Sequence, residues 1–426
     1  MEKIKITARQ WLRQSEKYLK TDMVYLVGSG FWILFGQITS GILSFILVII
    51  FANLVTKETY GLYRYILSVA GILNVFTLTG MNSAVAQAVA AGKEQALRVS
   101  VRYQLKWNML MLVVTVVLGA YYLLNGNLTL AISFLVMGIF SPLAATLNTY
   151  NAYLTGKKKF QQVGISSFIS TLVYVVGMVI AIYLGGNLIW LVIAYSLTTF
   201  LSNLMFYIIV LQIYRPTNVS SAETKEVLNY GRHLTFINYI APVASQIDSI
   251  ILNHFWGASS LATYSLATAM PNRATVMLKS SIGIGFPKFS TKTKEELNSV
   301  FSRRIFQGLA IGVACAIAYI VISPFLFRYL IPKYLDGLLY SQLLAINFIT
   351  ALPNRYIGLL LTAQKLSKTI FIDNLIQNAI RILLFIILGI WGGILGLIIA
   401  QMLFSFISLI INIIVWQRAT RTRDHA

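Results

Sequence analysis

The sequence has little charge: 11% of its 426 residues are Asp, Glu, Lys or Arg, whereas 57% are hydrophobic. Soluble domains carry about 25% charged residues, so this composition excludes a soluble globular enzyme. It also excludes a disordered chain, because disordered chains contain few hydrophobic residues. The single cysteine, Cys315, cannot form a disulfide within the chain. The composition indicates an integral membrane protein.

Motifs of catalysis and metal binding are also missing. The sequence contains no G-x-x-x-x-G-K-[ST] phosphate-binding loop, no H-E-x-x-H, no C-x-x-C and no G-x-S-x-G. Its three histidines, His233, His254 and His425, do not have the spacing of metal ligands. We therefore expect a protein that is not an enzyme and that binds no cofactor and no metal.

Long hydrophobic runs fill most of the chain. A helix needs about 20 mostly apolar residues to cross a bilayer core of about 30 Å, and we count twelve such runs, without the alternation typical of barrel strands. They are residues 29–54, 60–83, 107–125, 129–155, 162–184, 188–213, 233–256, 261–287, 305–327, 338–363, 370–390 and 392–416. The sequence therefore predicts an all-α polytopic membrane protein with twelve transmembrane helices. Gly392 and Gly393 mark the boundary between the last two.

Basic residues gather on one side of these predicted helices. The chain has 34 Lys and Arg against 13 Asp and Glu. With the N-terminus in the cytoplasm, 26 of the Lys and Arg fall in cytoplasmic segments and three in the opposite loops. Cytoplasmic loops are enriched in Lys and Arg, so we predict that both termini are cytoplasmic. This distribution explains the basic composition without a nucleic-acid partner.

The predicted helices divide into two sets of six. The segments that join helices 1–2 and 7–8, FANLVTKETYGLYRY and LNHFWGASSLATYSL, align at an offset of 201 residues, which places Tyr63 on Tyr264. Both sets start in the cytoplasm, so we expect a pseudo-twofold axis along the membrane normal with a substrate site between the halves. The expected parts are a cytoplasmic segment 1–28, an N-lobe 29–213, a cytoplasmic linker 214–232, a C-lobe 233–416 and a cytoplasmic tail 417–426.

Three segments resemble those of a known family. They are residues 51–87 (FANLVTKETYGLYRYILSVAGILNVFTLTGMNSAVAQ), 247–271 (IDSIILNHFWGASSLATYSLATAMP) and 361–401 (LTAQKLSKTIFIDNLIQNAIRILLFIILGIWGGILGLIIAQ). They resemble polysaccharide-unit flippases of the O-antigen type, which belong to the multidrug/oligosaccharidyl-lipid/polysaccharide (MOP) exporter superfamily. They cover about a quarter of the chain, and their order fits the twelve-helix layout.

This resemblance implies two six-helix lobes around a central cavity. It also implies a function, the movement of undecaprenyl-diphosphate-linked oligosaccharides across the cytoplasmic membrane of a bacterium. The expected partners are this lipid-linked oligosaccharide with its diphosphate head group and the membrane itself. The machinery that polymerises the polysaccharide is a candidate protein partner.

Ionisable residues inside the predicted helices are the candidate functional residues, because each costs about 2.5–3.5 kcal/mol at mid-membrane on insertion scales. We assign substrate binding to five cations, Arg64, Arg273, Lys279, Arg355 and Arg381. Arginine binds phosphate through a planar fork and lysine acts as a point charge, so this excess of cations suits a diphosphate. Arg64 is equally able to extend to the membrane interface.

Two acids lie in the same helices. Asp248 is the only acid deep in a predicted helix, and we assign it a coupling role as a proton- or cation-sensitive switch. Its depth differs from that of Arg273 by about 6 Å, so we expect the two to pair. Asp373 lies within a turn of the cytoplasmic end of its helix, where we expect it to be solvated.

Two other functions compete with the flippase. An ion-coupled exporter of small cationic molecules would require an acidic cavity, and the first run, 29–54, contains no acid. A membrane glycan polymerase or glycosyltransferase would require a loop domain or catalytic carboxylates, and the sequence offers neither. The sequence therefore favours a flippase, with the exporter as the alternative.

Overall fold

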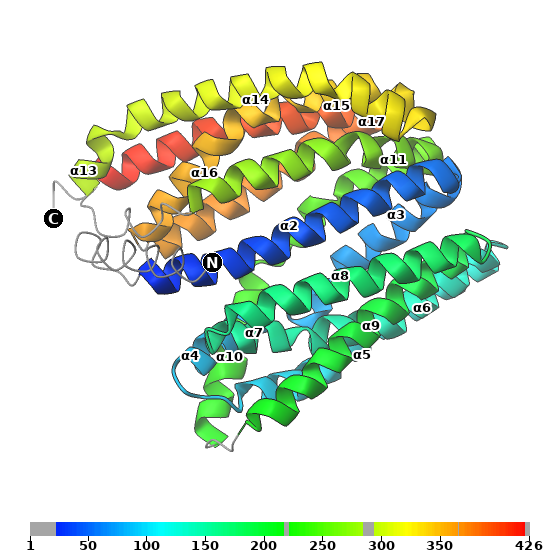
Figure 1. Ribbon diagram of the computed structural model, residues 1–426, viewed down its shortest axis with the longest axis horizontal. Helices are drawn as coiled ribbons and strands as arrows, with labels where there is room; N and C mark the ends of the chain where they lie inside the picture. The colour runs from blue at the N-terminus through cyan, green and yellow to red at the C-terminus, as the bar shows by residue number, and fades with distance from the viewer. Residues whose placement is uncertain (1–22, 217–220, 284–293, 365, 422–426) are drawn as a thin grey trace, which may run out of the picture. The chain divides into compact units, whose positions relative to one another are not determined.

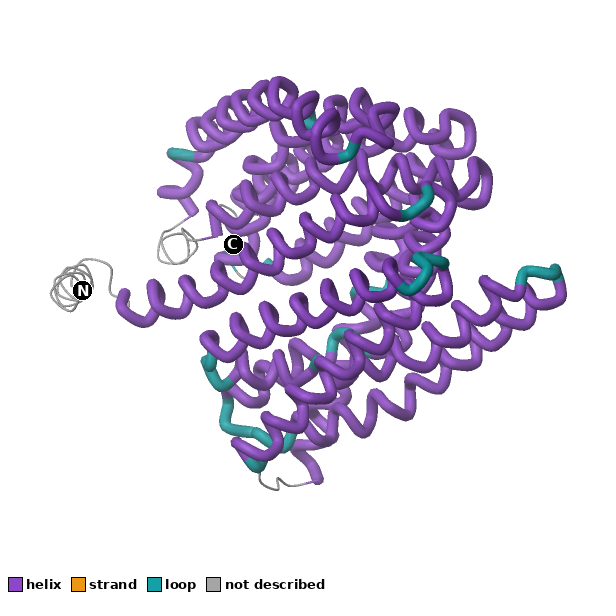
Figure 2. Tube along the Cα trace, turned by 45° about the vertical axis from the view of Figure 1, so that its right-hand side comes forward, coloured by secondary structure: helices purple, strands orange, loops and turns teal. Residues whose placement is uncertain are grey.

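The computed structural model describes residues 23–216, 221–283, 294–364 and 366–421. All regular elements in these ranges are helical, without a β-strand (Figure 2). This confirms the predicted all-α class. Parts of four predicted segments lie outside the described residues, namely 1–22 of the N-terminal segment, 217–220 of the linker, 284–293 and 365 of the C-lobe, and 422–426 of the tail.

The chain forms two compact units. The first unit comprises Met1–Leu47 and Asn74–Phe236, and the second unit comprises Val48–Leu73 and Ile237–Ala426. Helix α2 (Met23–Leu54) passes from the first unit into the second, and helix α3 (Lys57–Leu73) belongs wholly to the second (Figure 1). The second unit therefore combines an early helical hairpin with the C-terminal half of the chain.

The first unit is a bundle of long helices. It contains η1 (Asn74–Thr77), α4 (Met81–Ala90), α5 (Ala96–Leu124), α6 (Leu128–Leu147), α7 (Thr149–Gly156), α8 (Phe160–Tyr183), α9 (Leu188–Tyr214) and α10 (Ser221–Ile237). Gly164 of α8 lies against α2, since a Cβ atom added to it would lie 2.3 Å from the carbonyl oxygen of Trp32. Small residues of this kind allow membrane helices to approach closely.

The turn between α4 and α5 is attached to the end of α7. Glu94 forms an ion pair with Lys157 and accepts a hydrogen bond of 2.7 Å from the Tyr153 hydroxyl. Partial burial raises the pKa of the Glu94 carboxyl, but the hydrogen bonds from Lys157 and Tyr153 outweigh it and hold that pKa below its usual value. Tyr153 and Tyr150 are buried in a hydrophobic cluster.

The second unit contains two long helices that glycines interrupt. Its elements after α3 are α11 (Ile240–Gly283), α13 (Lys294–Ser299), α14 (Phe301–Leu330), η2 (Pro332–Gly337), α15 (Leu338–Leu344), α16 (Asn347–Ala363) and α17 (Ser367–Arg421). Gly257 breaks α11 with φ 81°, and Gly393 breaks α17 with φ 54°. Positive φ is readily available only to glycine. The predicted boundary at Gly392 and Gly393 is thereby confirmed.

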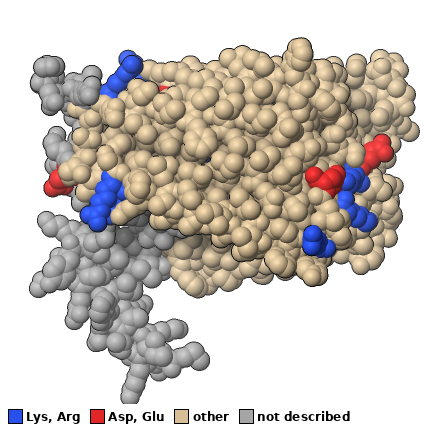
Figure 3. Space-filling view, turned by 90° about the horizontal axis from the view of Figure 1, so that it is seen from above, with Lys and Arg blue, Asp and Glu red and all other residues tan. Residues whose placement is uncertain are grey.

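Seven helices are long and apolar enough to cross a membrane, or nine if each of two bent helix pairs is one span, among the residues that the structure describes. Many large apolar side chains are exposed, including Leu124, Trp391 and Tyr183. On the face drawn in Figure 3, Lys, Arg, Asp and Glu gather toward the two ends and the broad surface between them consists of other residues. The chain is therefore a multi-pass membrane protein.

The count of spans is lower than the predicted twelve, and several helix boundaries differ. Helix α11 is not among the candidate spans; it carries Asp248, Arg273 and Lys279, which lower its hydropathy. Helix α5 begins at Ala96, where the sequence predicted residue 107. A hydropathy run detects only the hydrocarbon core, whereas a helix can continue into the interface with its charges solvated.

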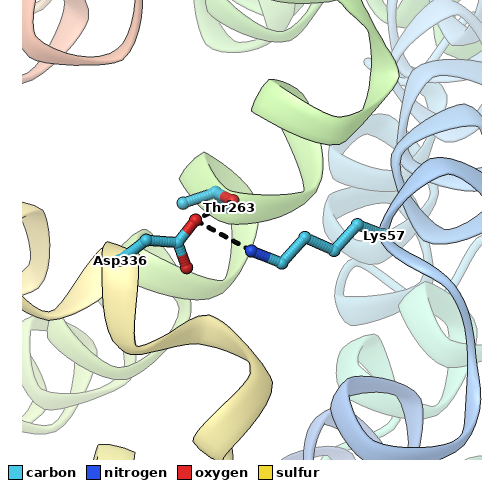
Figure 4. A network of polar contacts seen from close by, with 3 residues as sticks. All are labelled: Lys57, Thr263 and Asp336. Atoms are coloured by element: carbon cyan, nitrogen blue, oxygen red, sulfur yellow. Dashed lines mark hydrogen bonds and ion pairs between the residues drawn. The ribbon is translucent and has the colours of Figure 1, made fainter.

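Polar contacts join the hairpin of α2 and α3 to the rest of the second unit. Lys57 Nζ lies 2.8 Å from Asp336 Oδ2, which also accepts a 3.3 Å hydrogen bond from Thr263 (Figure 4). The Asn53 amide donates a 2.7 Å hydrogen bond to the carbonyl oxygen of Leu330. The ion pair is partly exposed and is worth about 0–1 kcal/mol. These contacts position α3 beside α11 and η2.

Candidate substrate-binding cavity

The second unit encloses a polar cavity of about 330 Å³. Its walls come from α11, α15, α16 and both parts of α17. The lining residues are Pro271, Asn272, Thr275, Lys279, Leu344, Asn347, Thr350, Ala351, Asn354, Gln377, Arg381, Gln401, Phe404, Ser405 and Ser408. Amides and hydroxyls predominate, two residues are cationic, and none of these lining residues is acidic.

Helical spacing explains how the sequence builds this wall. Positions three and four apart share one face of a helix. Successive lining residues are three, one and three positions apart on α16 and also on the last part of α17, namely Asn347, Thr350, Ala351 and Asn354, and Gln401, Phe404, Ser405 and Ser408. Each helix therefore turns one largely polar face toward the cavity.

One side of the cavity is held by a network of side-chain hydrogen bonds. Gln377 donates to Asp373 at 2.8 Å and to Asn412 at 3.0 Å, and it accepts from Ser408 at 2.7 Å. Asn412 donates to Asn354 at 2.8 Å. Buried polar groups with satisfied partners make a site rigid. These residues are thus preorganised by hydrogen bonds within the protein.

Asp373 does not lie where the sequence predicted. Its side chain is buried, with 7% exposure, so the prediction of a solvated acid is wrong. The prediction used depth along one helix, and depth does not determine what covers a side chain: Gln377, one turn further along α17, donates to one carboxylate oxygen, and the other oxygen is buried without a partner among the described residues. Asp373 adjoins the cavity through Gln377 without lining it.

Other polar side chains of the lining have no protein partner. Six of them make no side-chain hydrogen bond or ion pair within the described residues, namely Asn272, Thr275 and Lys279 of α11, Asn347 of α16, and Arg381 and Gln401 of α17. The Arg381 guanidinium carbon lies 5.0 Å from the ring centre of Phe385 and 5.9 Å from that of Phe404. Stacking of this kind fixes the plane of the guanidinium group. Apart from Asn347, whose amide oxygen is buried, these groups are available to a ligand.

Two of the five predicted substrate-binding cations line the cavity. They are Lys279 and Arg381, and Arg355 is near enough to affect Lys279 electrostatically although it is exposed and outside the lining. Arg273 is also exposed and outside the lining. Like charges so close repel one another, and an anionic ligand would relieve that repulsion.

Arg64 lies elsewhere in the second unit. It is partly buried, and its Nε donates a 3.4 Å hydrogen bond to Ser265 Oγ. The two residues are 201 positions apart, which is the offset of the internal repeat. Arg64 therefore bonds to the residue that the predicted repeat aligns with it.

Asp248 bonds to Tyr264 and does not pair with Arg273. Its carboxylate accepts a 2.8 Å hydrogen bond from the Tyr264 hydroxyl and a 2.7 Å bond from the Ser249 amide, and no ion pair joins it to Arg273, both being described residues. The predicted pair is therefore wrong. Asp248 lies nine residues before the break at Gly257 and Tyr264 lies seven residues after it, so the two are at similar distances from the break. Arg273 lies sixteen residues after the break, which is about 10 Å further from it than Asp248 along the helix axis.

The sequence prediction missed the uncharged amides of the cavity. Asn272, Asn347, Asn354, Gln377 and Gln401 all fall inside predicted hydrophobic runs. Amides within apolar segments commonly bond across helices or line a path, so a search for them would have found this wall. The predicted site residues were chosen among ionisable residues, and only two of them, Lys279 and Arg381, line the cavity.

The fold is shared with solved membrane transporters. The chain superposes on a structure titled lipid II flippase MurJ, inward closed conformation, with a TM-score of 0.67 and 17% identity over 90% of this chain and 87% of that one. A structure titled as the inward-facing conformation of a multidrug resistance MATE family transporter superposes with a TM-score of 0.67 and 13% identity, over 92% of this chain and 96% of that one. A MOP superfamily transporter from Pyrococcus furiosus superposes with a TM-score of 0.56 and 15% identity, over 93% of this chain and 96% of that one. The chain therefore shares its fold with these transporters.

The sequence itself assigns the family. Residues 26–291 match the family described as polysaccharide biosynthesis protein, which is more than half of the chain. No curated protein sequence matches. The chain belongs to this polysaccharide biosynthesis family, and the predicted resemblance is confirmed.

Proposed function

We propose that this protein is a flippase that moves undecaprenyl-diphosphate-linked oligosaccharides across the cytoplasmic membrane by alternating access. One observation carries the proposal: the cavity of the second unit holds two cations, Lys279 and Arg381, without an anionic partner among the described residues. A diphosphate supplies the missing negative charge, and the family links the chain to polysaccharide synthesis. Arg64, Arg273 and Arg355 would guide the same head group along its path.

The alternative is an ion-coupled exporter of small molecules. Its support is the fold alone, which the chain shares with multidrug resistance transporters. A cationic cavity repels the cationic molecules that such an exporter would carry, and the acids Asp248 and Asp373 lie outside the lining. The charge of the cavity thus favours an anionic substrate.

We propose twelve crossings with both termini in the cytoplasm. The nine candidate spans include α17 once, and its break at Gly393 adds one crossing. The two parts of α11 around Gly257 add two more. The 26-to-3 distribution of Lys and Arg supports the orientation. A cysteine at Asn127 should react with an impermeant reagent from outside the cell, and reaction only from the cytoplasm would reverse the assignment.

We propose that Asp248 couples transport to protons or cations. Asp248 bonds to Tyr264, and Arg64 and Arg381 are close enough to act on Tyr264 electrostatically. A change of charge on Asp248 would therefore change the electrostatic environment of both arginines. The Asp248→Asn protein should fold, since the amide oxygen can still accept from Tyr264, but its transport should fall and lose its dependence on pH. Transport equal to wild type at every pH in vesicles would leave Asp248 a structural residue.

Reconstitution tests the function itself. Purified protein in liposomes should move fluorescent polyprenyl-diphosphate oligosaccharide between leaflets, measured as the fraction that an added glycan-modifying enzyme can reach. Empty liposomes are the control for spontaneous movement. Movement at the rate of empty liposomes, together with export of small cationic dyes, would support the exporter and contradict the flippase.

A further inference from the structure

We infer that Asn272, Thr275 and Gln401 form a sugar-binding subsite, which receives the sugar attached directly to the diphosphate while Lys279 and Arg381 hold the phosphate groups. This inference rests on the proposed function and assigns the recognition of one sugar ring to a part of the second unit. It separates residues that bind every substrate from residues that recognise the glycan.

The chemistry of the three side chains matches a sugar. An amide group both donates and accepts hydrogen bonds, and so does a hydroxyl group. Sugar hydroxyls have the same double character, so neutral amides and hydroxyls can bond to them without adding charge. Asn272, Thr275 and Gln401 have no side-chain partner among the described residues, so a ligand need not break a protein bond to reach them.

Apart from these three residues and Asn347, whose amide oxygen is buried, the neutral polar side chains of the lining are bonded within the protein. Gln377 and Ser408 bond to each other, and Asn354 bonds to Asn412. Their hydrogen-bonding groups are already occupied and shape the wall. On α11, Asn272 and Thr275 are three positions apart, and Lys279 follows four positions later on the same face.

The size and charge of the cavity fit a sugar beside a phosphate. Ligand pockets measure about 300–1,000 Å³, so 330 Å³ is at the small end and suits one sugar ring better than a whole oligosaccharide. Lys279 and Arg381 line the same cavity as the amides. A group that is neutral at one end and anionic at the other would therefore satisfy both sets of residues at once.

Binding to two probes tests the subsite. We would compare farnesyl diphosphate with farnesyl-diphospho-N-acetylglucosamine, using full-length protein in nanodiscs, and repeat the comparison with galactosyl and glucosyl probes. Wild type should bind at least one sugar-bearing probe about tenfold more tightly than farnesyl diphosphate. Thr275→Val and Gln401→Met should each reduce that preference about five- to tenfold, because a hydrogen bond is worth about 1 kcal/mol.

Controls make the result specific. Both variants keep side-chain size, so they should bind farnesyl diphosphate as wild type does and melt at the same temperature. Gln307→Met changes an exposed amide of α14 outside the cavity and should change neither affinity.

Two outcomes would overturn the subsite while leaving the flippase intact. One is that wild type shows no preference for any sugar-bearing probe. The other is that each variant weakens all probes equally. Failure of wild type to bind any diphosphate probe, together with no movement of lipid-linked oligosaccharide in liposomes, would instead contradict the proposed function.

Discussion

Replacing Arg381 by alanine should abolish flipping of all lipid-linked glycans alike. Arg381 is the cavity cation whose guanidinium lies over the rings of Phe385 and Phe404, and no described acid pairs with it. Hydrogen bonds to charged groups are worth about 1.5–3 kcal/mol, which predicts a loss of affinity for farnesyl diphosphate of about 10- to 100-fold. Arg381→Lys should restore only part of it, because lysine lacks the planar fork. Binding and flipping are measured in parallel.

A structural role for Arg381 predicts a different result. If its main contribution is stacking on Phe385 and Phe404, the alanine protein would melt at a lower temperature and still bind farnesyl diphosphate normally. That pair of results would remove Arg381 from the binding site. Arg328→Ala is the matched control, since Arg328 is an exposed arginine at the end of α14 and outside the cavity.

The helices could be predicted because their signal is local. An apolar run of about 20 residues specifies a membrane helix wherever it lies, and α8 and α9 lie within two residues of their predicted bounds. The break at Gly393 was also visible, because paired glycines interrupt the run. The signal was weaker in the charged segments around Gly257, where the hydrophobic pattern predicted helices at 233–256 and 261–287. The structure instead forms α11 over Ile240–Gly283, with a break at Gly257.

The site could be predicted only in part, because it depends on which helices meet. Asp248 bonds to Tyr264 since both lie at similar distances from Gly257, and that requires knowing where the chain turns. Asp373 is buried although it lies near one end of its helix, and its position along that helix does not reveal the burial. Lys279 and Arg381 were found because charge inside a hydrophobic run is conspicuous, whereas neutral amides are not.

The close contact of α3 with α11 has its own consequence for stability. Gly61 faces the backbone of Ala258 so closely that a Cβ atom on it would lie 1.8 Å from the carbonyl oxygen and 2.4 Å from the carbonyl carbon. The obstacle is backbone, so no side chain can move aside. Any larger residue at position 61 must separate α3 from α11, the helix that carries Asp248 and the α11 wall of the cavity.

The Gly61→Ala protein should therefore melt at a lower temperature than wild type and flip more slowly. Overpacking costs about 1–3 kcal/mol, which exceeds the 0.5–1 kcal/mol that alanine gains over glycine inside a helix. Gly358→Ala is the matched control: Gly358 lies in helix α16 of the same unit, and no atom lies within 4 Å of an added Cβ. The two substitutions should thus have opposite signs, with Gly358→Ala neutral or stabilising. Thermal unfolding in detergent measures both, and a Gly61→Ala melting temperature equal to that of wild type would show that α3 and α11 are not held this closely.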